Sequence, residues 1–244
     1  MDVDVGRRTD LSGREPSPPR PDVSTLAGHV ADQLAVLDAL GLETVDVLGM
    51  SLGGFVAVQL AATAPERVRS LTLLDGGPPM VRRPTSREQL EAAFADRIAR
   101  LGTDWPDLAS YVHFVVPNTG SLFDPADPHL ATCLAHDLER GRDGGRVGLD
   151  GRTLVDDAAD VFLTDTAADA LRRLSEPTQL LYAEWSVGPG SPPAYTDDEV
   201  AAVVAASDGL VTAQLLRGHD HAGVLMSDSG AAASVQALRR SLAG

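Results

Sequence analysis

The sequence predicts an α/β fold: a mostly parallel sheet flanked by helices, with a helical cap inserted over residues 78–176. Two observations predict it. Apolar, strand-like stretches alternate with helical stretches over residues 23–77 and again over residues 177–244. Between these two parts the alternation is lost, and helical patterns and turn-rich loops take its place. Such alternation favours a parallel sheet covered by helices, with the insertion over the carboxyl ends of the strands.

The first half of the predicted core holds one strand–helix–strand unit. Residues 1–22 are rich in Arg, Pro and Asp and are expected to form a loop. Residues 23–42 carry an apolar helical stripe, with Asp22 or Ser24 as the expected cap. A strand at 44–48, a helix ending before Pro65 and a buried strand in RSLTLLDGG follow within about 35 residues, the length of a βαβ unit.

The same sequence patterns predict the elements of the insertion and of the second half of the core. TSREQLEAAFADRIARL and DPHLATCLAHDLER are expected to be amphipathic helices, and GRDGGRVGLDG a turn-rich loop. The core then resumes with a strand in TQLLYAE, a helix in DDEVAAVVAA, a strand in LVTAQLLRG and a final helix in SGAAASVQALRRSL. We therefore assign residues 23–77 and 177–244 to the core, and residues 78–176 to a helical cap.

Composition excludes several function classes. The 244 residues carry 35 acidic and 20 basic side chains, a net charge of −15, and every basic residue is arginine. Such an acidic chain is a poor candidate for nucleic-acid binding. A single cysteine excludes an internal disulfide and a CxxC metal site, and no metal or organic cofactor is implied. No segment has the length of a membrane span, and the N-terminus lacks the apolar region of a signal peptide, so we expect a cytoplasmic protein without a membrane partner.

One serine stands at a strand-to-helix junction. Ser51 lies in GMSLG, where the strand pattern VDVLGM passes into the helical pattern GGFVAVQLA. A serine hydroxyl is a weak nucleophile that must be activated by a base and presented on a sharp turn. Gly49 and Gly53 are expected to leave room for that turn, and the helix would aim the Leu52 N–H at a developing oxyanion. A tight turn with a capping serine would leave the small residues on both sides unexplained.

The segment around Ser51 resembles a known family. GMSLGG resembles the nucleophile elbow of the α/β-hydrolases, and ADQLAVLDALGLETVDVLGMSLGGFVAVQLAATAPERVRSLTLLDGG is similar to that family almost position by position. The resemblance is strong over residues 22–77 and weaker over residues 177–242. It implies a serine hydrolase that cleaves an ester or related acyl bond of a small-molecule substrate. Two alternatives stay open: a cofactor-free haloperoxidase-like or C–C-bond hydrolase of the same fold, and a truncated, non-catalytic binding protein.

The resemblance also implies a catalytic histidine after the last strand, because the family's chain order is nucleophile, acid, histidine. LLRGHDHAGVLM supplies His219 and His221, and the family's usual spacing from a glycine, here Gly218, favours His221. The remaining histidines are expected to be structural: His29, His113, His129 and His136.

Two carboxylates compete for the role of the acid. Ser186 occupies the position of the family's usual aspartate and cannot serve. Glu184 ends the same strand, and Asp75 ends the earlier strand LTLLD, where some family members place their acid. We favour Glu184 by a small margin, and we expect Asp197 and Asp198 to cap the following helix.

The resemblance leaves the substrate open and raises a question about the sheet. Substrate contacts are expected from Met50, Trp105, Tyr111 and Phe114. In the family, three further strands precede the matched region, and a His-Gly loop supplies a second oxyanion N–H. No such motif occurs in this sequence, so the resemblance implies an uncovered edge beside the nucleophile strand. One lost oxyanion donor typically costs ~10²–10³ in rate.

Overall fold

A four-stranded parallel sheet forms the centre of the computed structural model, which describes residues 6–14, 16–118 and 123–243. Its strands are arranged in chain order: β1 (Val45–Met50), β2 (Val68–Leu74), β3 (Thr178–Trp185) and β4 (Val211–Asp220). All three neighbouring pairs are parallel, which confirms the predicted fold class. Among the described residues β1 pairs only with β2 and forms one edge of the sheet.

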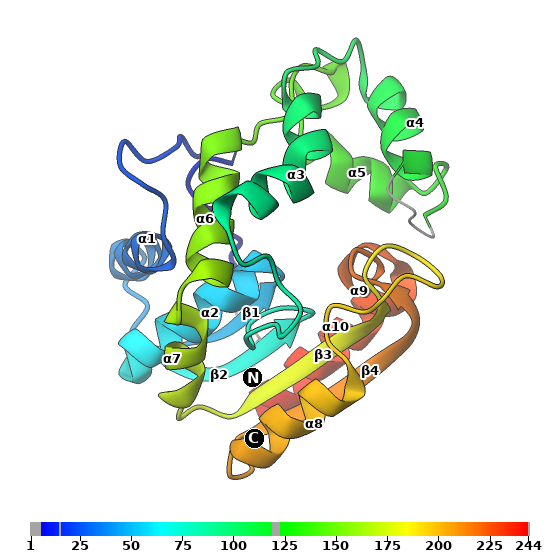
Figure 1. Ribbon diagram of the computed structural model, residues 1–244. Helices are drawn as coiled ribbons and strands as arrows, with labels where there is room; N and C mark the ends of the chain where they lie inside the picture. Colours follow the sequence, from blue (N-terminus) through cyan, green and yellow to red (C-terminus); the bar gives the residue numbers. More distant parts are fainter. Residues whose placement is uncertain (1–5, 15, 119–122, 244) are drawn as a thin grey trace.

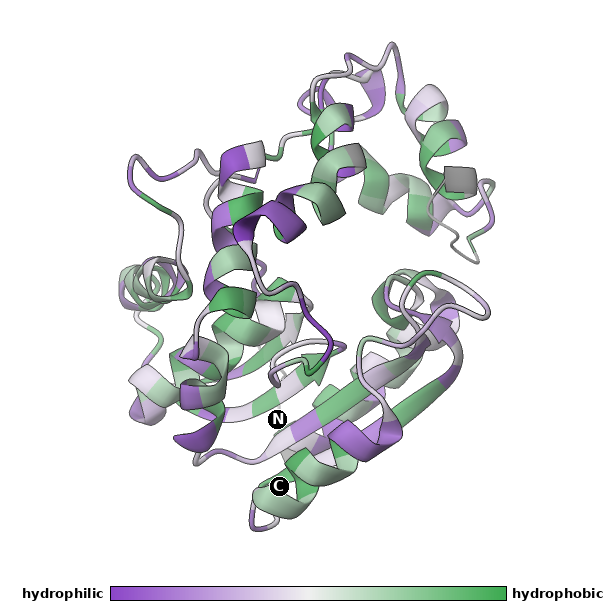
Figure 2. Ribbon diagram, viewed as in Figure 1, coloured by the Kyte–Doolittle hydropathy of each residue, from purple (hydrophilic) through white to green (hydrophobic). Residues whose placement is uncertain are grey.

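Helices cover both faces of the sheet (Figures 1 and 2). The strands point apolar side chains alternately to the two faces, so both faces need to be covered. On β3, Leu180 and Tyr182 join one buried cluster, whereas Leu181 and Ala183 join another on the opposite face. The first face is covered by helices α1 (Leu26–Ala39), α2 (Leu52–Thr63), α7 (Thr166–Arg172) and α8 (Asp197–Ala206). The second face is covered by α9 (Gly223–Met226) and α10 (Asp228–Ala243).

Two of the predicted helix caps are wrong. Thr25 caps α1, because its side chain accepts the Gly28 N–H at 3.1 Å, and Ser24 instead donates to Asp157 at 2.6 Å. Thr196 caps α8 in a reciprocal capping box with Glu199. The helix starts one residue earlier than the acidic pair suggests, so Asp197 and Asp198 lie in its first turn.

The insertion between β2 and β3 consists of two parts. Helices α3 (Arg87–Leu101), α4 (Leu108–Asn118) and α5 (Pro128–His136) stand off the sheet, and we call residues 87–138 the outer cap (Figure 1). Helices α4 and α5 share their own apolar cluster. Helix α6 (Gly151–Leu163) carries α3 and then runs down to the sheet layers, where Val161 and α7 pack into the core cluster. The predicted cap segment therefore also supplies part of the core.

None of the helices in the described part of the chain combines the length and the apolar character that crossing a membrane requires.

Candidate active site

Ser51 occupies a strained turn between β1 and α2. Its φ of 51° and ψ of −121° fall in a region that non-glycine residues rarely adopt, and such strain gathers at functional sites. The Ser51 N–H donates to the Leu74 carbonyl oxygen at 2.9 Å, which ties the turn to the end of β2. The Ser51 hydroxyl makes no capping hydrogen bond to α2. A helix cap therefore does not account for this serine.

Close backbone packing explains most of the glycines around the turn. A Cβ atom on Gly49 would lie 2.3 Å from the Gly53 carbonyl oxygen, and one on Gly76 would lie 2.2 Å from the Ser51 carbonyl oxygen. A Cβ atom on Gly54 would in turn meet the Gly76 backbone at 2.7 Å. Gly53 has open space around its Cβ position, so the crowding expected there is wrong. The tight contact is between the Ser51 turn and the turn that follows β2.

His221 and Asp75 meet at the carboxyl edge of the sheet. Asp75 directly follows β2, and His221 directly follows β4. The His221 Nδ1 lies 2.6 Å from Asp75 Oδ2, and the Ala183 N–H donates to Asp75 Oδ1 at 3.0 Å. The Asp75 side chain is fully buried, while the His221 side chain is 34% exposed. An ionised carboxylate only accepts hydrogen bonds, so Nδ1 is the donor of this bond, and in the neutral imidazole Nε2 then keeps a lone pair.

The structure does not bring Glu184 to His221, contrary to the preferred assignment. Glu184 Oε2 accepts the Gly218 N–H at 2.7 Å, beside a shift in the β3–β4 register between Ala183 and Trp185. Its carboxylate thus holds the irregular end of β4. His219 is also occupied elsewhere, since its Nδ1 lies 2.9 Å from the Arg217 carbonyl oxygen and its Nε2 lies 2.8 Å from Ser229 Oγ.

Leu52 and Met50 flank Ser51 as expected from their positions in the chain. Leu52 is the first residue of α2, so its N–H belongs to the first helical turn, where amides have no partner within the helix. That N–H is available to an oxyanion. Met50 ends β1 and packs, half-buried, against the apolar cluster beneath α9 and α10.

The three predicted aromatic contacts pack against one another in the outer cap. The Trp105 ring lies 5.4 Å from the Tyr111 ring and 5.0 Å from the Phe114 ring, measured between centroids. Tyr111 is buried, and its hydroxyl donates to Asp137 Oδ2 at 3.4 Å. Burial first, and then the nearby Asp137 charge, raise the pKa of Tyr111. Tyr111 belongs to the apolar cluster between α4 and α5, and Trp105 packs against that cluster.

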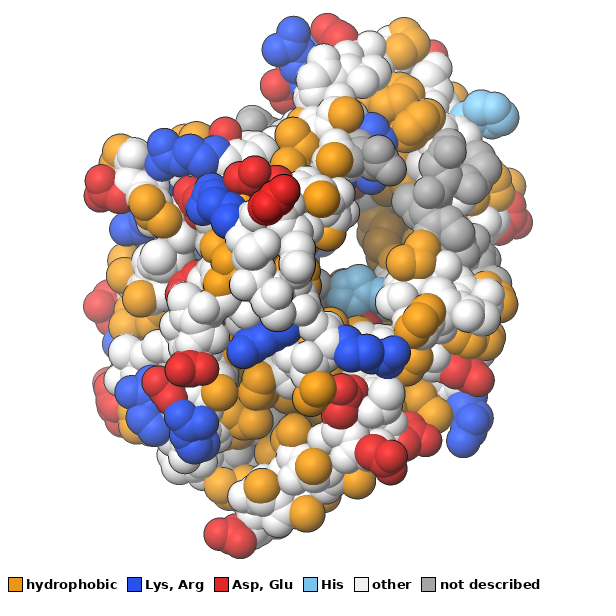
Figure 3. All heavy atoms as spheres, viewed as in Figure 1, with side chains coloured by type: hydrophobic (Ala, Val, Ile, Leu, Met, Phe, Trp, Pro, Cys, Tyr) orange, Lys and Arg blue, Asp and Glu red, His pale blue; other side chains and the backbone are white. Residues whose placement is uncertain are grey.

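A hollow separates the outer cap from the sheet layers, and a histidine ring is visible inside it (Figure 3). The outer cap also touches the loop that carries His221. Met226, at the end of the short helix α9, packs against the α4–α5 cluster. The cap and the histidine loop are therefore in direct contact.

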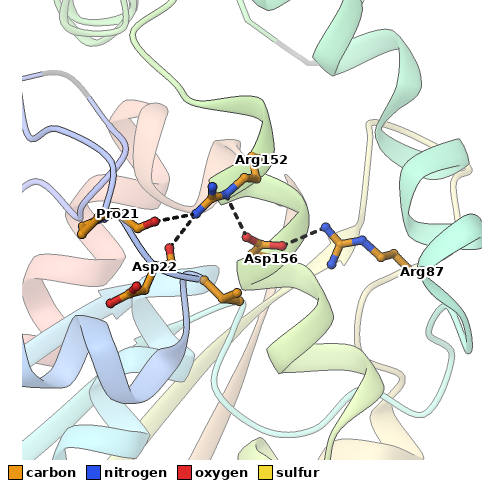
Figure 4. A pocket seen from close by; sticks show the side chains of 6 residues that line it. Pro21, Asp22, Arg87, Arg152 and Asp156 are labelled. Carbon is orange, nitrogen blue, oxygen red and sulfur yellow. Dashed lines mark hydrogen bonds and ion pairs between the residues drawn. The ribbon is translucent and has the colours of Figure 1, made fainter.

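A second cavity, of about 680 Å³, lies at the base of α3 and α6 (Figure 4). In it, Arg87 and Arg152 flank the Asp156 carboxylate at 2.8 Å and 3.5 Å. Arg152 also donates to the Asp22 carbonyl oxygen at 2.7 Å. The cavity is lined by Pro21, Asp22, Val23, Arg87, Arg152 and Asp156. None of these is a predicted site residue. The Arg87–Asp156 ion pair joins the outer cap to α6, and the hydrogen bonds from Arg152 join the N-terminal segment to α6.

Comparison with known proteins agrees with this architecture. Residues 9–107 match the family model described as alpha/beta hydrolase fold. The chain is 49% identical over 48 residues to 2-hydroxymuconate semialdehyde hydrolase of Pseudomonas putida, covering 20% of this chain and 17% of that protein. It is also 49% identical over 47 residues to rhodomycin D methylesterase DnrP of Streptomyces peucetius, covering 19% and 16%. The matched segments span at most 24% of the length of the curated relatives.

The likeness in three dimensions extends over nearly the whole chain. The crystal structure of E-2-(acetamidomethylene)succinate hydrolase matches with a TM-score of 0.71 at 17% identity, covering 95% of this chain and 80% of that one. At this identity the match shows the fold. Together with the family match over residues 9–107 and the Ser51 turn between β1 and α2, it shows that the chain has the α/β-hydrolase fold.

Proposed function

We propose that this protein is a serine hydrolase that cleaves an ester or related acyl bond of a small molecule, with Ser51 as nucleophile, His221 as base and Asp75 as the acid. The observation that carries the proposal is the 2.6 Å hydrogen bond between His221 and the buried Asp75, at the sheet edge where Ser51 sits on its strained turn. The methylesterase relative is consistent with ester chemistry.

In the proposed reaction the Ser51 Oγ attacks the carbonyl carbon of the substrate while its proton passes to His221 Nε2. The imidazolium that forms is stabilised by Asp75, whose carboxylate is fixed on its other oxygen by the Ala183 N–H. The Leu52 N–H donates to the oxygen that becomes negative, at the positive end of α2. Each partner therefore acts on charge that appears only in the transition state.

The second half of the reaction reverses these roles. His221 gives its proton to the departing alkoxide, which leaves as the alcohol, and an acyl group remains on Ser51. His221 then accepts a proton from a water molecule that attacks this acyl group, and it returns that proton to Ser51 Oγ as the acyl C–O bond breaks, so the carboxylic acid and free Ser51 are released. The hollow between the outer cap and the sheet supplies a space for the substrate (Figure 3).

The test is covalent labelling with a fluorophosphonate, which reacts with activated serines, together with turnover of 4-nitrophenyl esters. We expect Ser51→Ala to abolish both while leaving the thermal midpoint nearly unchanged. Ser207→Ala is the matched control, because its hydroxyl bonds the Val204 carbonyl oxygen at the opposite, amino-terminal edge of β4. It should label and turn over like the unmodified chain.

Two results would contradict the proposal. Equal ester turnover by the unmodified chain and Ser51→Ala would show that Ser51 is not the nucleophile. Absence of both labelling and turnover in the unmodified chain would favour the alternative of a non-catalytic binding protein. Labelling of Ser51 without ester turnover would keep the nucleophile and redirect the search to another bond, including the C–C-bond and haloperoxidase-like alternatives.

A further inference from the structure

One buried carboxylate beside the candidate active site has no part in the proposed reaction. Asp220 is the last residue of β4, directly before His221, and it is 2% exposed. Aspartate is almost never buried to this degree without a partner, because removing the charge from water is costly. Among the described residues its partner is a backbone amide, since Asp220 Oδ1 accepts the Gly223 N–H at 2.7 Å. The carboxylate therefore holds the backbone just beyond His221.

The Gly223 amide belongs to a fixed point of the fold. Gly223 begins α9, which lies beside the end of β4 and packs against α10 (Figure 1). Its carbonyl oxygen accepts the Ser227 hydroxyl at 2.6 Å, and a Cβ atom on Gly230 would lie 2.0 Å from that oxygen. Val224, the next residue, is fully buried. The backbone at Gly223 is therefore held on both sides and cannot shift without moving α10.

His221 lies in the short turn between these two fixed residues. On its amino-terminal side, Asp220 pairs with Trp185 in the last register position of β3 and β4. On its carboxyl-terminal side, Gly223 is packed against α10. The Asp220–Gly223 hydrogen bond spans the turn and joins its two ends. The imidazole is 34% exposed, and its Nδ1 atom lies 2.6 Å from Asp75 Oδ2, so the direction of the ring toward Asp75 depends on how this turn is held.

We propose that Asp220 is a positioning residue for the base: its buried carboxylate fixes the turn that carries His221, in the position from which Nδ1 reaches Asp75. This inference rests on the proposed function for the role of His221. Positioning matters to a general base because a displacement of about 1 Å can cost about 10²-fold in rate. The contact requires an accepting oxygen and not the charge, and the side-chain oxygen of asparagine also accepts. The change from aspartate to asparagine should therefore be tolerated at Asp220, although it is damaging at Asp75.

The test is steady-state kinetics on a 4-nitrophenyl ester with two variants of Asp220. We expect Asp220→Ala to lower kcat about 10- to 100-fold and to keep KM within about twofold, because the buried carboxylate does not reach the substrate. We expect Asp220→Asn to keep kcat within about threefold, because its oxygen still accepts the Gly223 N–H. If Asp220→Asn loses about tenfold or more, the base needs the charge and not the hydrogen bond, and the inference is wrong whether or not Asp220→Ala folds.

Asp150→Ala is the matched control, because Asp150 makes the same kind of bond at the start of α6. Its Oδ1 accepts the Thr153 N–H at 2.7 Å, at the same separation along the chain as Asp220 and Gly223. Both alanine variants lose a carboxylate and one backbone hydrogen bond, so both should be less stable than the unmodified chain. Only Asp220→Ala should lose turnover. Equal losses of kcat in the two variants would reduce the role of Asp220 to general stability and overturn the inference.

A second measurement needs no turnover and separates the inference from the proposed function. In protein with isotope-labelled histidine, the Nδ1 proton of His221, held by Asp75, should give a low-field NMR signal, which His221→Ala identifies by its loss. We expect this signal to move or to broaden beyond detection in Asp220→Ala, and to stay in place in Asp220→Asn and Asp150→Ala.

The outcomes of the two measurements are distinct. If no ester is hydrolysed but the signal depends on Asp220, the proposed function fails and the positioning role remains. If the signal is absent from the unmodified chain, or is unchanged in Asp220→Ala, the inference is overturned even where ester turnover supports the proposed function.

Discussion

The Asp75 carboxylate reaches His221 across the width of β3. Asp75 follows β2, His221 follows β4, and Oδ2 of the former lies 2.6 Å from Nδ1 of the latter. The intervening strand takes part, since the Ala183 N–H holds Oδ1 at 3.0 Å. Both carboxylate oxygens are therefore fixed, and the imidazole is held in one orientation.

This arrangement predicts which carboxylate supports turnover. Asp75→Asn replaces one of the two carboxylate oxygens with an NH2 group. If that donor faces His221, it favours the tautomer without a proton on Nδ1, which is the wrong one for catalysis. We expect it to lower kcat by about 10⁴, the order known for a triad aspartate. Glu184→Gln should lower kcat less than about threefold, because its carboxylate serves the Gly218 backbone. Steady-state kinetics on a 4-nitrophenyl ester measures both, and a larger loss in Glu184→Gln would restore Glu184 as the acid.

The two histidines of the same loop should differ just as strongly. His221→Ala removes the proposed base, and we expect turnover to fall by about 10³ or more with little change in thermal midpoint. His219→Ala loses contacts with the Arg217 carbonyl and Ser229, both away from Asp75, so its turnover should remain within about threefold. Comparable losses in the two variants would mean that the loop, and not the His221 ring, is what the reaction needs.

The glycine contacts predict a pair of variants with opposite outcomes. Gly76→Ala would set a Cβ atom 2.2 Å from the Ser51 carbonyl oxygen, so the turn must move. We expect a loss of about 2 kcal/mol in stability and of at least tenfold in turnover. Gly53→Ala meets nothing within 4 Å and lies within α2, so it should keep its activity and gain up to about 1 kcal/mol. Urea unfolding and ester turnover of both variants check the prediction.

The fold could be predicted from the sequence because, over most of the core, the local sequence patterns match the strands and helices that form. The strands at β1 and β2 and the helix between them are marked by apolar runs, glycines and Pro65, all of which act within a few residues. The same signals located Ser51. The second turn that supports Ser51 was not recognised, because Gly76 looks like an ordinary strand stop until its contact with Ser51 is seen.

The pairing of Asp75 with His221 could not be read from spacing alone. Both Glu184 and Asp75 end neighbouring strands, and their separation from His221 depends on the register shift at the end of β3. That shift turns Glu184 toward Gly218.

A buried cluster outside the candidate site joins the N-terminal segment, α1 and α6. The Ser24 hydroxyl and His29 Nε2 donate to Asp157 Oδ1 at 2.6 Å and 2.8 Å, and Arg14 pairs with Oδ2 at 2.9 Å. Desolvation alone would raise the pKa of Asp157, but the hydrogen bonds from His29 and Ser24 and the charges of His29 and Arg14 outweigh it, so the pKa is lowered. The cluster ties the helix that carries the outer cap to the core.

Because the pKa of folded Asp157 lies below its unfolded value of about 3.9, the cluster stabilises the fold fully above that pH and loses its contribution as the pH falls through the folded pKa. We expect Asp157→Asn to cost about 3 kcal/mol at pH 7, with the same difference at pH 5.5 and a smaller one below about pH 4. Urea unfolding at these three pH values measures it. Asp165→Asn is the control, since Asp165 is exposed and its side chain makes no cap bond to α7. An Asp157→Asn difference that stays constant to pH 3.5, or a cost equal to that of Asp165→Asn at pH 7, would show that the ionised carboxylate does not hold α6 in place.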